Sequence, residues 1–242
     1  MMKLSIIIPT YNEKLNVIYL IKKIEFALKK HKLDSEIIFV DDNSPDGTGR
    51  ILNELKKQYS NLKVINRLQK KSLSSAVIQG WKNAKGSIFC VMDADLSHDP
   101  EKIIELYNPI INNEAELTIG SRYVKYGRIE GFGITRKVMS KAGVFLGRLF
   151  TDVKDPMSGF FMIKKGYALN TKLNPKGFKI LLELIIKSKP KRIKEIPITF
   201  TSRKKGKSKI GITEIFIMLY NVIRYLPHLK CINNNNNKSK IM

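Results

Sequence analysis

The amino-acid sequence predicts an α/β domain with a mainly parallel sheet flanked by helices on both faces. Short apolar runs alternate along the first half of the chain with segments whose apolar residues recur at helical spacing, which is typical of βαβ units. Two of these runs end in aspartates, at the edge where an open parallel sheet binds its ligands. Hydrophobic residues make up 43% of the 242 residues, which is enough for a real core.

The expected elements follow in order from the N-terminus. The strands are short apolar runs at residues 4–8, 37–40, 62–65, 88–92, 117–119 and 196–200. Helices are expected at residues 17–28, 51–59, 76–84, 136–150 and 212–226. The first, second and last of these have apolar residues at helical spacing, and residues 136–150 are rich in small and basic residues. Asp99 and Pro100 have the character of an N-cap and a first helical residue, and they predict one more helix.

We expect one large domain over residues 1–210, an amphipathic helix over residues 211–229 and a disordered, asparagine-rich tail over residues 230–242. The first apolar stretch is too short for a signal-peptide core, and no uninterrupted apolar run of about 18 residues indicates a membrane span. Cys90 and Cys231 form neither a disulfide framework nor a metal-ligand spacing. Cys90 lies in an apolar run, which indicates a buried thiol and a reducing, cytosolic setting.

The formal net charge of +23 points to an anionic partner without choosing one. Nucleic acid, anionic lipid and phosphorylated small molecules are all compatible with it. A compositional bias towards lysine, isoleucine and asparagine also accounts for the excess. The charge alone therefore decides nothing about function.

Four aspartates stand at the ends of two expected strands. Asp41 and Asp42 close the strand at residues 37–40, and Asp93 and Asp95 follow the strand at residues 88–92. Because the carboxyl ends of parallel strands share one edge of a sheet, we expect these carboxylates to converge. Such a pair suits Mg²⁺ or Mn²⁺, which take oxygen ligands from carboxylates and substrate phosphates.

Three segments carry a more specific signal. They read SIIIPTYNE at residues 5–13, VDDNSPDGT at residues 40–48 and MDADLSH at residues 92–98. In these segments the chain resembles the family-2 glycosyltransferases, and most of all their dolichol-phosphate mannose synthase branch. Further segments agree with this resemblance in the same order, at residues 120–123, 155–160, 194–198 and 203–209. It covers roughly residues 3–226 and implies a GT-A-type, Rossmann-like fold.

The resemblance implies a nucleotide-sugar site at the strand ends. The residues that it places against the donor are Pro9, Tyr11, Glu13, Val40, Asp42, Asp93, Ala94, Asp95, Arg203 and Lys209. Among them, Asp93 and Asp95 are expected to hold the metal ion. Arg203 and Lys209 lie in a basic loop that is expected to close over the donor.

The resemblance also implies a cationic half of the site. Arg122, Arg136 and Ser140 correspond to positions that hold an acceptor phosphate, and the planar fork of arginine suits phosphate. Asp95, Arg122 and Arg136 are the candidate catalytic residues. A phosphate oxygen would attack the anomeric carbon with inversion, and no general base is needed because the phosphate is already ionised.

Two local departures from the family pattern accompany the resemblance. Residues 71–76 read KSLSSA where the family often has a glycine-rich stretch. Ser97 stands where some relatives place a longer polar side chain near the metal, so water would complete the coordination sphere. We expect His98 to be a turn residue rather than a metal ligand.

The implied reaction transfers mannose from GDP-mannose to dolichyl (polyprenyl) phosphate, which requires a membrane surface as a partner. The helix at residues 212–226 has an apolar face that either lies in the membrane interface or packs on the domain. We expect a peripheral enzyme at the cytoplasmic face of a membrane, or one that borrows a membrane subunit.

Two alternatives remain open. The chain is either a related family-2 enzyme with another donor, such as UDP-glucose, or another acceptor, or it belongs to a different class, the basic nucleic-acid-binding proteins. The second alternative has no helix-turn-helix, zinc-finger or aromatic RNA-binding motif to support it, so no nucleic-acid partner is expected.

Overall fold

The structure is a computed structural model that describes residues 3–68, 72–174 and 179–202. The basic loop at residues 203–209, the helix expected at residues 212–226 and the tail at residues 230–242 lie outside the described residues. The expectations for them therefore stay predictions.

Seven strands form one sheet in the order β3-β2-β1-β4-β7-β5-β8. Their bounds are β1 Leu4–Thr10, β2 Ser35–Asp41, β3 Leu62–Asn66, β4 Ile88–Val91, β5 Leu117–Ser121, β7 Phe161–Lys164 and β8 Ile193–Pro197. Neighbouring strands are parallel except at β7, which runs antiparallel between β4 and β5. The mainly parallel sheet is confirmed, and β7 is a strand that the sequence did not predict.

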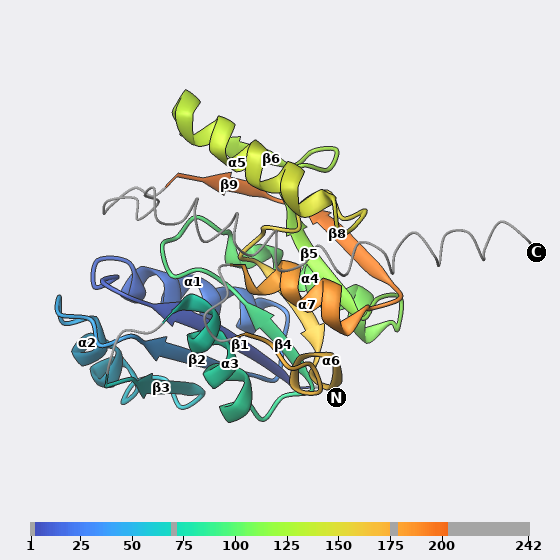
Figure 1. Ribbon diagram of the computed structural model, residues 1–242. Coiled ribbons are helices and arrows are strands. Elements are labelled where there is room, and N and C mark those ends of the chain that lie inside the picture. The colour runs from blue at the N-terminus through green and yellow to red at the C-terminus, as the bar shows by residue number, and fades with distance from the viewer. Residues whose placement is uncertain (1–2, 69–71, 175–178, 203–242) are drawn as a thin grey trace, which may run out of the picture.

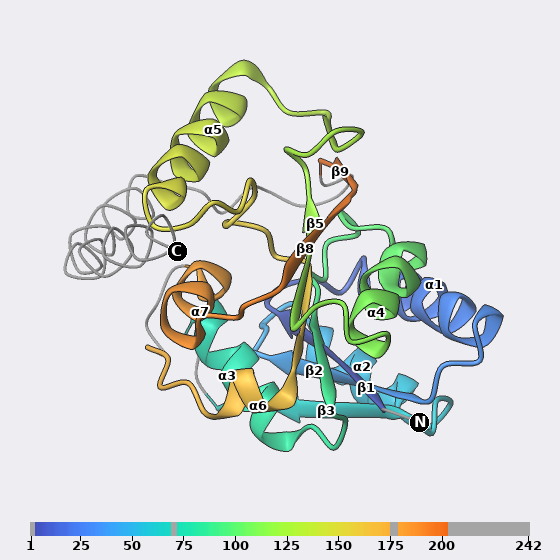
Figure 2. The same ribbon diagram turned by 90° about the vertical axis from the view of Figure 1, so that its right-hand side faces the viewer.

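Helices cover both faces of this sheet, as Figure 2 shows. One face carries α1 Val17–Lys30, α2 Thr48–Leu55 and α4 Ile103–Ile111, the last preceded by a 3-10 turn at Pro100–Lys102. The other face carries α3 Leu73–Asn83, α6 Lys165–Leu169 and α7 Ile180–Ser188. Alternate residues of β1 enter the two layers: Ile6 and Ile8 pack under α1, and Ile7 packs under α3. Cys90 is fully buried in this core.

The strand expected at residues 196–200 is divided in two. β8 ends at Pro197, which has no N–H to continue a ladder, and the chain then leaves the main sheet. β9 Thr199–Thr201 pairs with β6 Arg128–Glu130 in a second, two-stranded sheet. The parallel pair β5 and β8 thus continues as the parallel pair β6 and β9.

The helix α5 Ile134–Arg148 stands above the second sheet and apart from the main one (Figure 1). Gly143, Val144 and Gly147 are its buried residues. Val144 packs with Phe150 and Met157 and with side chains of α7. Most of this helix therefore faces away from the core.

Candidate active site

The four strand-end aspartates lie at the same edge of the main sheet. β1 separates β2, which carries Asp41, from β4, which leads into Asp93. Two steps across a sheet are about 10 Å. The expected convergence of these carboxylates is therefore present in the fold.

Asp93 and Asp95 follow β4 in a turn with fixed side chains. Asp95 is buried, and its Oδ1 accepts the backbone N–H of Ser97 at 3.1 Å. Asp93 is 30% exposed, and it packs against Gly159. A Cβ at position 159 would lie 2.5 Å from Asp93 Oδ2, so only glycine leaves the carboxylate in this position.

His98 lies in a bend, as the sequence indicated, and its side chain is buried within the site. Its Nε2 lies 3.2 Å from Asp93 Oδ2, and its side chain is 1% exposed. The ring packs between Phe160 and Phe200, with centroid distances of 5.2 and 5.0 Å. The sequence could not show this burial because both aromatic partners come from distant strands or loops.

Asp42 forms a buried ion pair that the sequence did not reveal. Its Oδ1 lies 2.8 Å from Arg67 Nη1, and both side chains are buried. Arg67 Nη2 donates to Ser75 Oγ at 2.7 Å. The ion pair borders a shallow pocket that Arg50 and Asn66 help to line. A ligand at the end of β2 would thus meet a carboxylate whose orientation is set by arginine.

The serines that replace a glycine-rich stretch form the cap of α3. Ser72 Oγ accepts the N–H of Ser75, and Ser75 Oγ accepts the N–H of Ser72, each at 3.1 Å. This reciprocal capping box satisfies two donors at the helix start. The departure from the family pattern is therefore accommodated locally, while Lys71 lies outside the described residues.

The first motif lies on and after β1. Pro9 and Tyr11 are half-buried, and Glu13 is buried, with Oε2 accepting from Asn16 Nδ2 at 2.7 Å. The backbone N–H of Glu13 donates to Thr48 Oγ1 at 2.9 Å, which ties this segment to the start of α2. Two further residues of the expected donor set, Val40 and Ala94, are buried apolar side chains.

Arg122 follows β5 and is held by the buried Asp155. Its Nε and Nη2 donate to the two Asp155 oxygens at 2.7 and 2.8 Å, and its backbone N–H donates at 3.0 Å. Burial by itself would lower the pKa of Arg122, but the bonds and charge of Asp155 and the nearby charge of Asp93 raise it overall. Arg122 is thus a positive charge of fixed orientation that interacts electrostatically with Asp93, one of the two candidate metal ligands.

Arg136 and Ser140 lie one turn apart on α5 and so share one face of it. Ser140 Oγ lies 2.8 Å from the hydroxyl of Tyr123, whose ring lies 5.3 Å from Arg122 Cζ. Arg136 Cζ lies 4.0 Å from the centroid of the Phe132 ring. Tyr123 therefore links Arg122 to Ser140, and Arg136 lies one helical turn from Ser140.

Lys179, at the start of α7, is a further cation that sequence reasoning missed. Burial lowers its pKa, and the negative charge of Asp93 opposes that shift. Nothing in its sequence neighbourhood distinguishes it from the many surface lysines. Arg203 and Lys209 lie outside the described residues, so their expected roles remain predictions.

The comparisons with known proteins identify the family. Residues 5–170 match the model of glycosyl transferase family 2. The chain belongs to glycosyltransferase family 2. It is 46% identical to a dolichol-phosphate mannosyltransferase of Pyrococcus furiosus over 93% of this chain, and it spans 64% of that relative's length. It is 37% identical to the dolichol-phosphate mannosyltransferase of Saccharomyces cerevisiae, over 93% of this chain and 85% of the relative.

Solved structures of low sequence identity share the fold of this glycosyltransferase. Glucosyl-3-phosphoglycerate synthase from Mycobacterium tuberculosis, in complex with uridine diphosphate, superimposes with a TM-score of 0.67 at 19% identity, covering 95% of this chain and 80% of that one. Mannosyl-3-phosphoglycerate synthase from Rubrobacter xylanophilus gives 0.67 at 16% identity, covering 92% and 72%. The GT-A-type fold expected from the sequence is confirmed.

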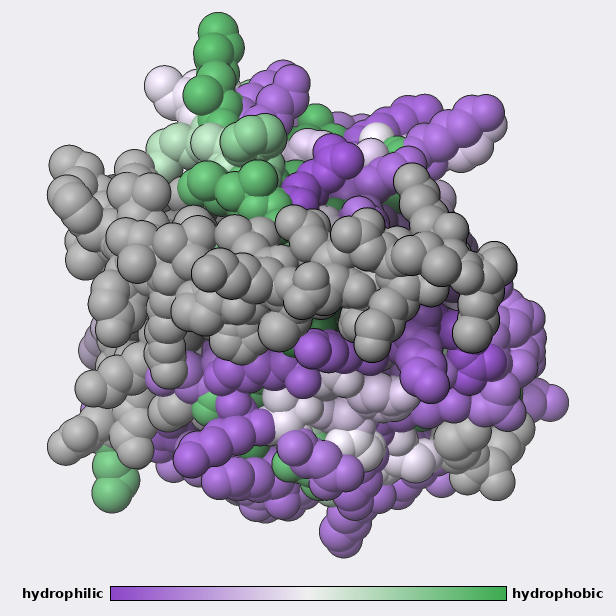
Figure 3. Space-filling view, turned by 45° about the vertical axis from the view of Figure 1, so that its right-hand side comes forward, coloured by the Kyte–Doolittle hydropathy of each residue, from purple (hydrophilic) through white to green (hydrophobic). Residues whose placement is uncertain are grey.

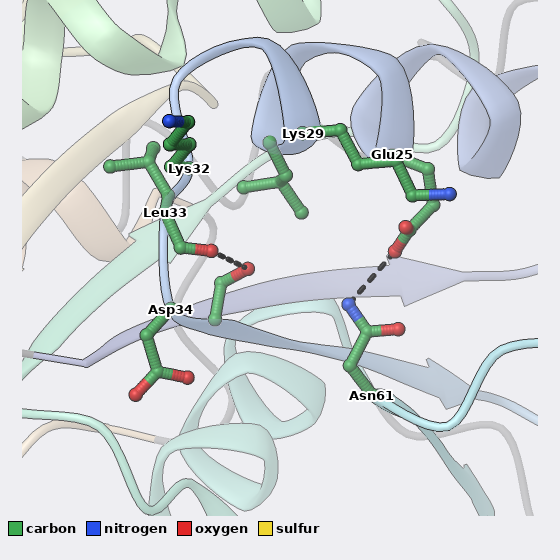
Figure 4. Close-up of a pocket in the computed structure, with 8 residues that line it drawn as sticks. Glu25, Lys29, Lys32, Leu33, Asp34 and Asn61 are labelled. Atoms are coloured by element: carbon green, nitrogen blue, oxygen red, sulfur yellow. Dashed lines mark hydrogen bonds between the residues drawn. The ribbon is translucent and has the colours of Figure 1, made fainter.

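Another pocket of the glycosyltransferase lies away from these residues (Figure 4). Glu25, Lys32 and Asp34 help to line it, between the end of α1 and the start of β2. The seven residues of β2 separate it from the aspartate edge, a distance of about 20 Å. It has no part in the site described above.

Proposed function

We propose that this glycosyltransferase transfers mannose from GDP-mannose to dolichyl (polyprenyl) phosphate, with inversion at the anomeric carbon. The names of its relatives support this acceptor and sugar. The observation that carries the proposal is the division of one site into two charged halves. Asp93 and Asp95 suit a metal-bound donor diphosphate, and Arg122 beside them suits a second phosphate.

The donor half fits a divalent metal ion. Asp93 is partly exposed and held in place by His98 and Gly159, and Asp95 lies beside it. Among the described residues, no group of three or more His, Cys, Asp or Glu side chains forms a complete metal site. Two carboxylates, with water and diphosphate oxygens completing the shell, are a usual arrangement for Mg²⁺ or Mn²⁺. When bound, the ion neutralises charge on the leaving diphosphate.

Structural neighbours lend the metal further support. The Mycobacterium tuberculosis enzyme has been solved in complex with Mn²⁺, UDP-glucose and phosphoglyceric acid. A UDP-sugar is therefore the second candidate donor for this chain. With either donor, Asp42 is expected to contact the nucleotide base, as the resemblance implies. Its ion pair with Arg67, which fixes the orientation of the carboxylate, supports this role.

The acceptor half would hold the lipid phosphate with Arg122, Arg136 and Ser140. Two anions must approach each other in this reaction, so the contribution of these residues is electrostatic and positional. Asp155 leaves Arg122 charged and oriented. No general base is required, because the acceptor phosphate is ionised near neutral pH.

The helix α5 supports contact with a lipid surface. Ile134, Val138, Phe145 and Leu149 are exposed and recur at helical spacing, with exposed Lys137, Lys141 and Arg148 beside them. Figure 3 shows apolar atoms gathered over this part of the molecule. Such a helix binds membranes through its apolar face, and each nearby basic residue adds about 1 kcal/mol on anionic lipid. The same helix carries Arg136 and Ser140 on its other side, where Ser140 contacts Tyr123, so docking would hold the acceptor half of the site close to the membrane.

Within the described residues, no helix combines the length and apolar character needed to cross a membrane. We propose peripheral attachment at the cytoplasmic face, supported by the exposed apolar face of α5 and by the apolar helix expected at residues 212–226. A membrane subunit would be an additional route to the same surface.

A thermal-shift panel tests the donor assignment. GDP-mannose, GDP, UDP-glucose and UDP are each added with Mn²⁺ or Mg²⁺. We expect the guanosine ligands to raise the melting temperature, and only with metal present. A larger shift with the uridine ligands would replace the proposed donor.

A further inference from the structure

The ring of Phe200 lies between the two charged halves of the site. Phe200 is the central residue of β9 and is buried. It lies outside the two apolar layers that cover the main sheet. Three neighbours surround its ring: His98 at 5.0 Å and Phe132 at 5.6 Å between centroids, both edge-to-face, and Arg122 Cζ at 5.4 Å from the centroid.

Each neighbour of Phe200 leads to a charged group. His98 contacts Asp93, and Phe132 lies under the guanidinium of Arg136. Arg122 packs on Phe200 directly. One ring is thus the common support of a carboxylate in the donor half and of both arginines in the acceptor half.

We propose that Phe200 is a positioning residue that sets the distance and orientation of Arg122 and Arg136 relative to Asp93. An aromatic ring has a negative face that attracts cations and a positive edge, so it favours defined angles to its neighbours. Its side chain has only two rotatable bonds, which makes it a stiff spacer. A leucine would keep an apolar side chain at this position but would be smaller and would lose these directional contacts.

The position of β9 supports this role over simple packing. The N–H of Thr201 donates to the carbonyl of Ser97 at 3.2 Å, beside the Asp93–Asp95 turn. On its other side β9 pairs with β6, which leads to Phe132 and α5. Phe200 therefore lies on the strand that joins the donor turn to the acceptor helix.

Four variants of the 242-residue chain separate positioning from packing. Phe200→Leu removes the ring, and Phe200→Tyr restores it. Phe132→Leu removes only the support of Arg136. Phe89→Leu is the matched control, because Phe89 is fully buried and stacks on Trp81 at 6.2 Å within the main core.

Steady-state transfer to a short-chain polyprenyl phosphate measures the effect. For Phe200→Leu we expect the acceptor KM to rise about tenfold, with a higher half-saturating Mn²⁺ concentration and an unchanged KM for GDP-mannose. Phe132→Leu should raise the acceptor KM alone, and Phe200→Tyr should recover most of the loss. Phe89→Leu should lower the melting temperature without changing either KM. If Phe200→Leu fails to fold, the acceptor KM values of Phe132→Leu and Phe200→Tyr still test the proposal.

The inference rests on the proposed function. The transfer activity of the wild-type enzyme distinguishes a failure of the proposed function from a failure of the inference. No transfer by the wild-type enzyme to polyprenyl phosphate overturns the proposed function. In that case, calorimetric titration measures the affinity for inorganic phosphate with and without the Phe200 ring and needs no turnover. Equal affinity in wild type and Phe200→Leu overturns the inference. With an active wild type, an unchanged acceptor KM in Phe200→Leu, or an equal rise in Phe89→Leu, overturns it as well.

Discussion

At the scale of single residues, the site depends on close contacts that leave no room for a larger side chain. Gly159 is the clearest case, because an added Cβ would lie 2.5 Å from one Asp93 oxygen and 2.9 Å from the other. Asp93 is partly exposed, so its carboxylate would move aside at little cost to the fold. A change at position 159 would therefore damage the site rather than the stability.

Gly159→Ala should raise the half-saturating Mn²⁺ concentration by at least about tenfold, since a displaced ligand weakens metal binding. The melting temperature should change little. Gly166→Ala is the matched control, because a Cβ there meets nothing within 4 Å. Metal titration of the two variants by transfer rate makes the comparison. Equal titration curves would show that Asp93 does not hold the metal.

Asp155→Asn should destabilise the protein by about 3 kcal/mol, because it leaves the buried guanidinium of Arg122 without a counter-charge. Asp155 is fully buried and Arg122 is 11% exposed. Urea denaturation measures the loss. Glu105→Gln removes an exposed partner of Lys102 and should cost less than about 1 kcal/mol. Similar losses in both variants would contradict the structural role of the Arg122–Asp155 pair.

The same pair changes how the acceptor role should be tested. Arg122→Ala would leave the buried carboxylate of Asp155 without its counter-charge. The measured change in activity would then combine a loss of stability with a loss of acceptor binding. Arg136 lies on α5, away from that pair, and Arg136→Ala should raise the acceptor KM while leaving the melting temperature near that of wild type.

At the scale of elements, Glu116 and Arg192 join the starts of β5 and β8. Glu116 accepts from Arg192 Nε at 2.8 Å and from its backbone N–H at 2.6 Å. Burial raises the pKa of Glu116, but the hydrogen bonds to Arg192 and its positive charge together outweigh burial. The pKa of Glu116 therefore lies below its usual value of 4.5.

This depressed pKa stabilises the folded state above the unfolded pKa of about 4.5, and the stabilisation is lost as the pH falls through the folded value. Glu116→Gln should therefore lower the free energy of unfolding at pH 7 and flatten its decline below pH 4.5. Urea titrations at several pH values test this. A parallel decline in variant and wild type would refute the linkage.

The helix α5 is the element on which membrane contact depends. Phe145→Glu places a charge in its exposed apolar face, and it should weaken binding to anionic vesicles at least about tenfold. Turnover with a short, soluble polyprenyl phosphate should stay unchanged. Tyr19→Glu on α1, which is also exposed, controls for the added charge. Equal vesicle binding by the two variants would remove α5 from the interface.

At the scale of the whole molecule, the regular part of the fold is predictable and the cross-connections are not. Strand ends that carry Asp42 and Asp93 meet because parallel strands share an edge, which the sequence pattern indicates. The antiparallel β7 has no such signal: its short apolar run follows a turn at residues 156–157, but the run itself does not indicate whether the strand pairs parallel or antiparallel. His98, Arg67 and Lys179 join the site through packing of segments distant in sequence. A family resemblance names motif residues, but these supporting contacts become visible only in three dimensions.

The central claim is that Asp93, Asp95 and a metal ion serve the donor of a lipid-phosphate mannosyltransferase. The most direct measurement is transfer of labelled mannose from GDP-mannose to dolichyl phosphate by the wild-type chain and by Asp95→Asn, with Mn²⁺ and with excess chelator. We expect mannosyl lipid only from the wild-type chain with metal, and a folded but inactive Asp95→Asn. Full transfer by Asp95→Asn, or by the wild-type chain in chelator, would contradict the account.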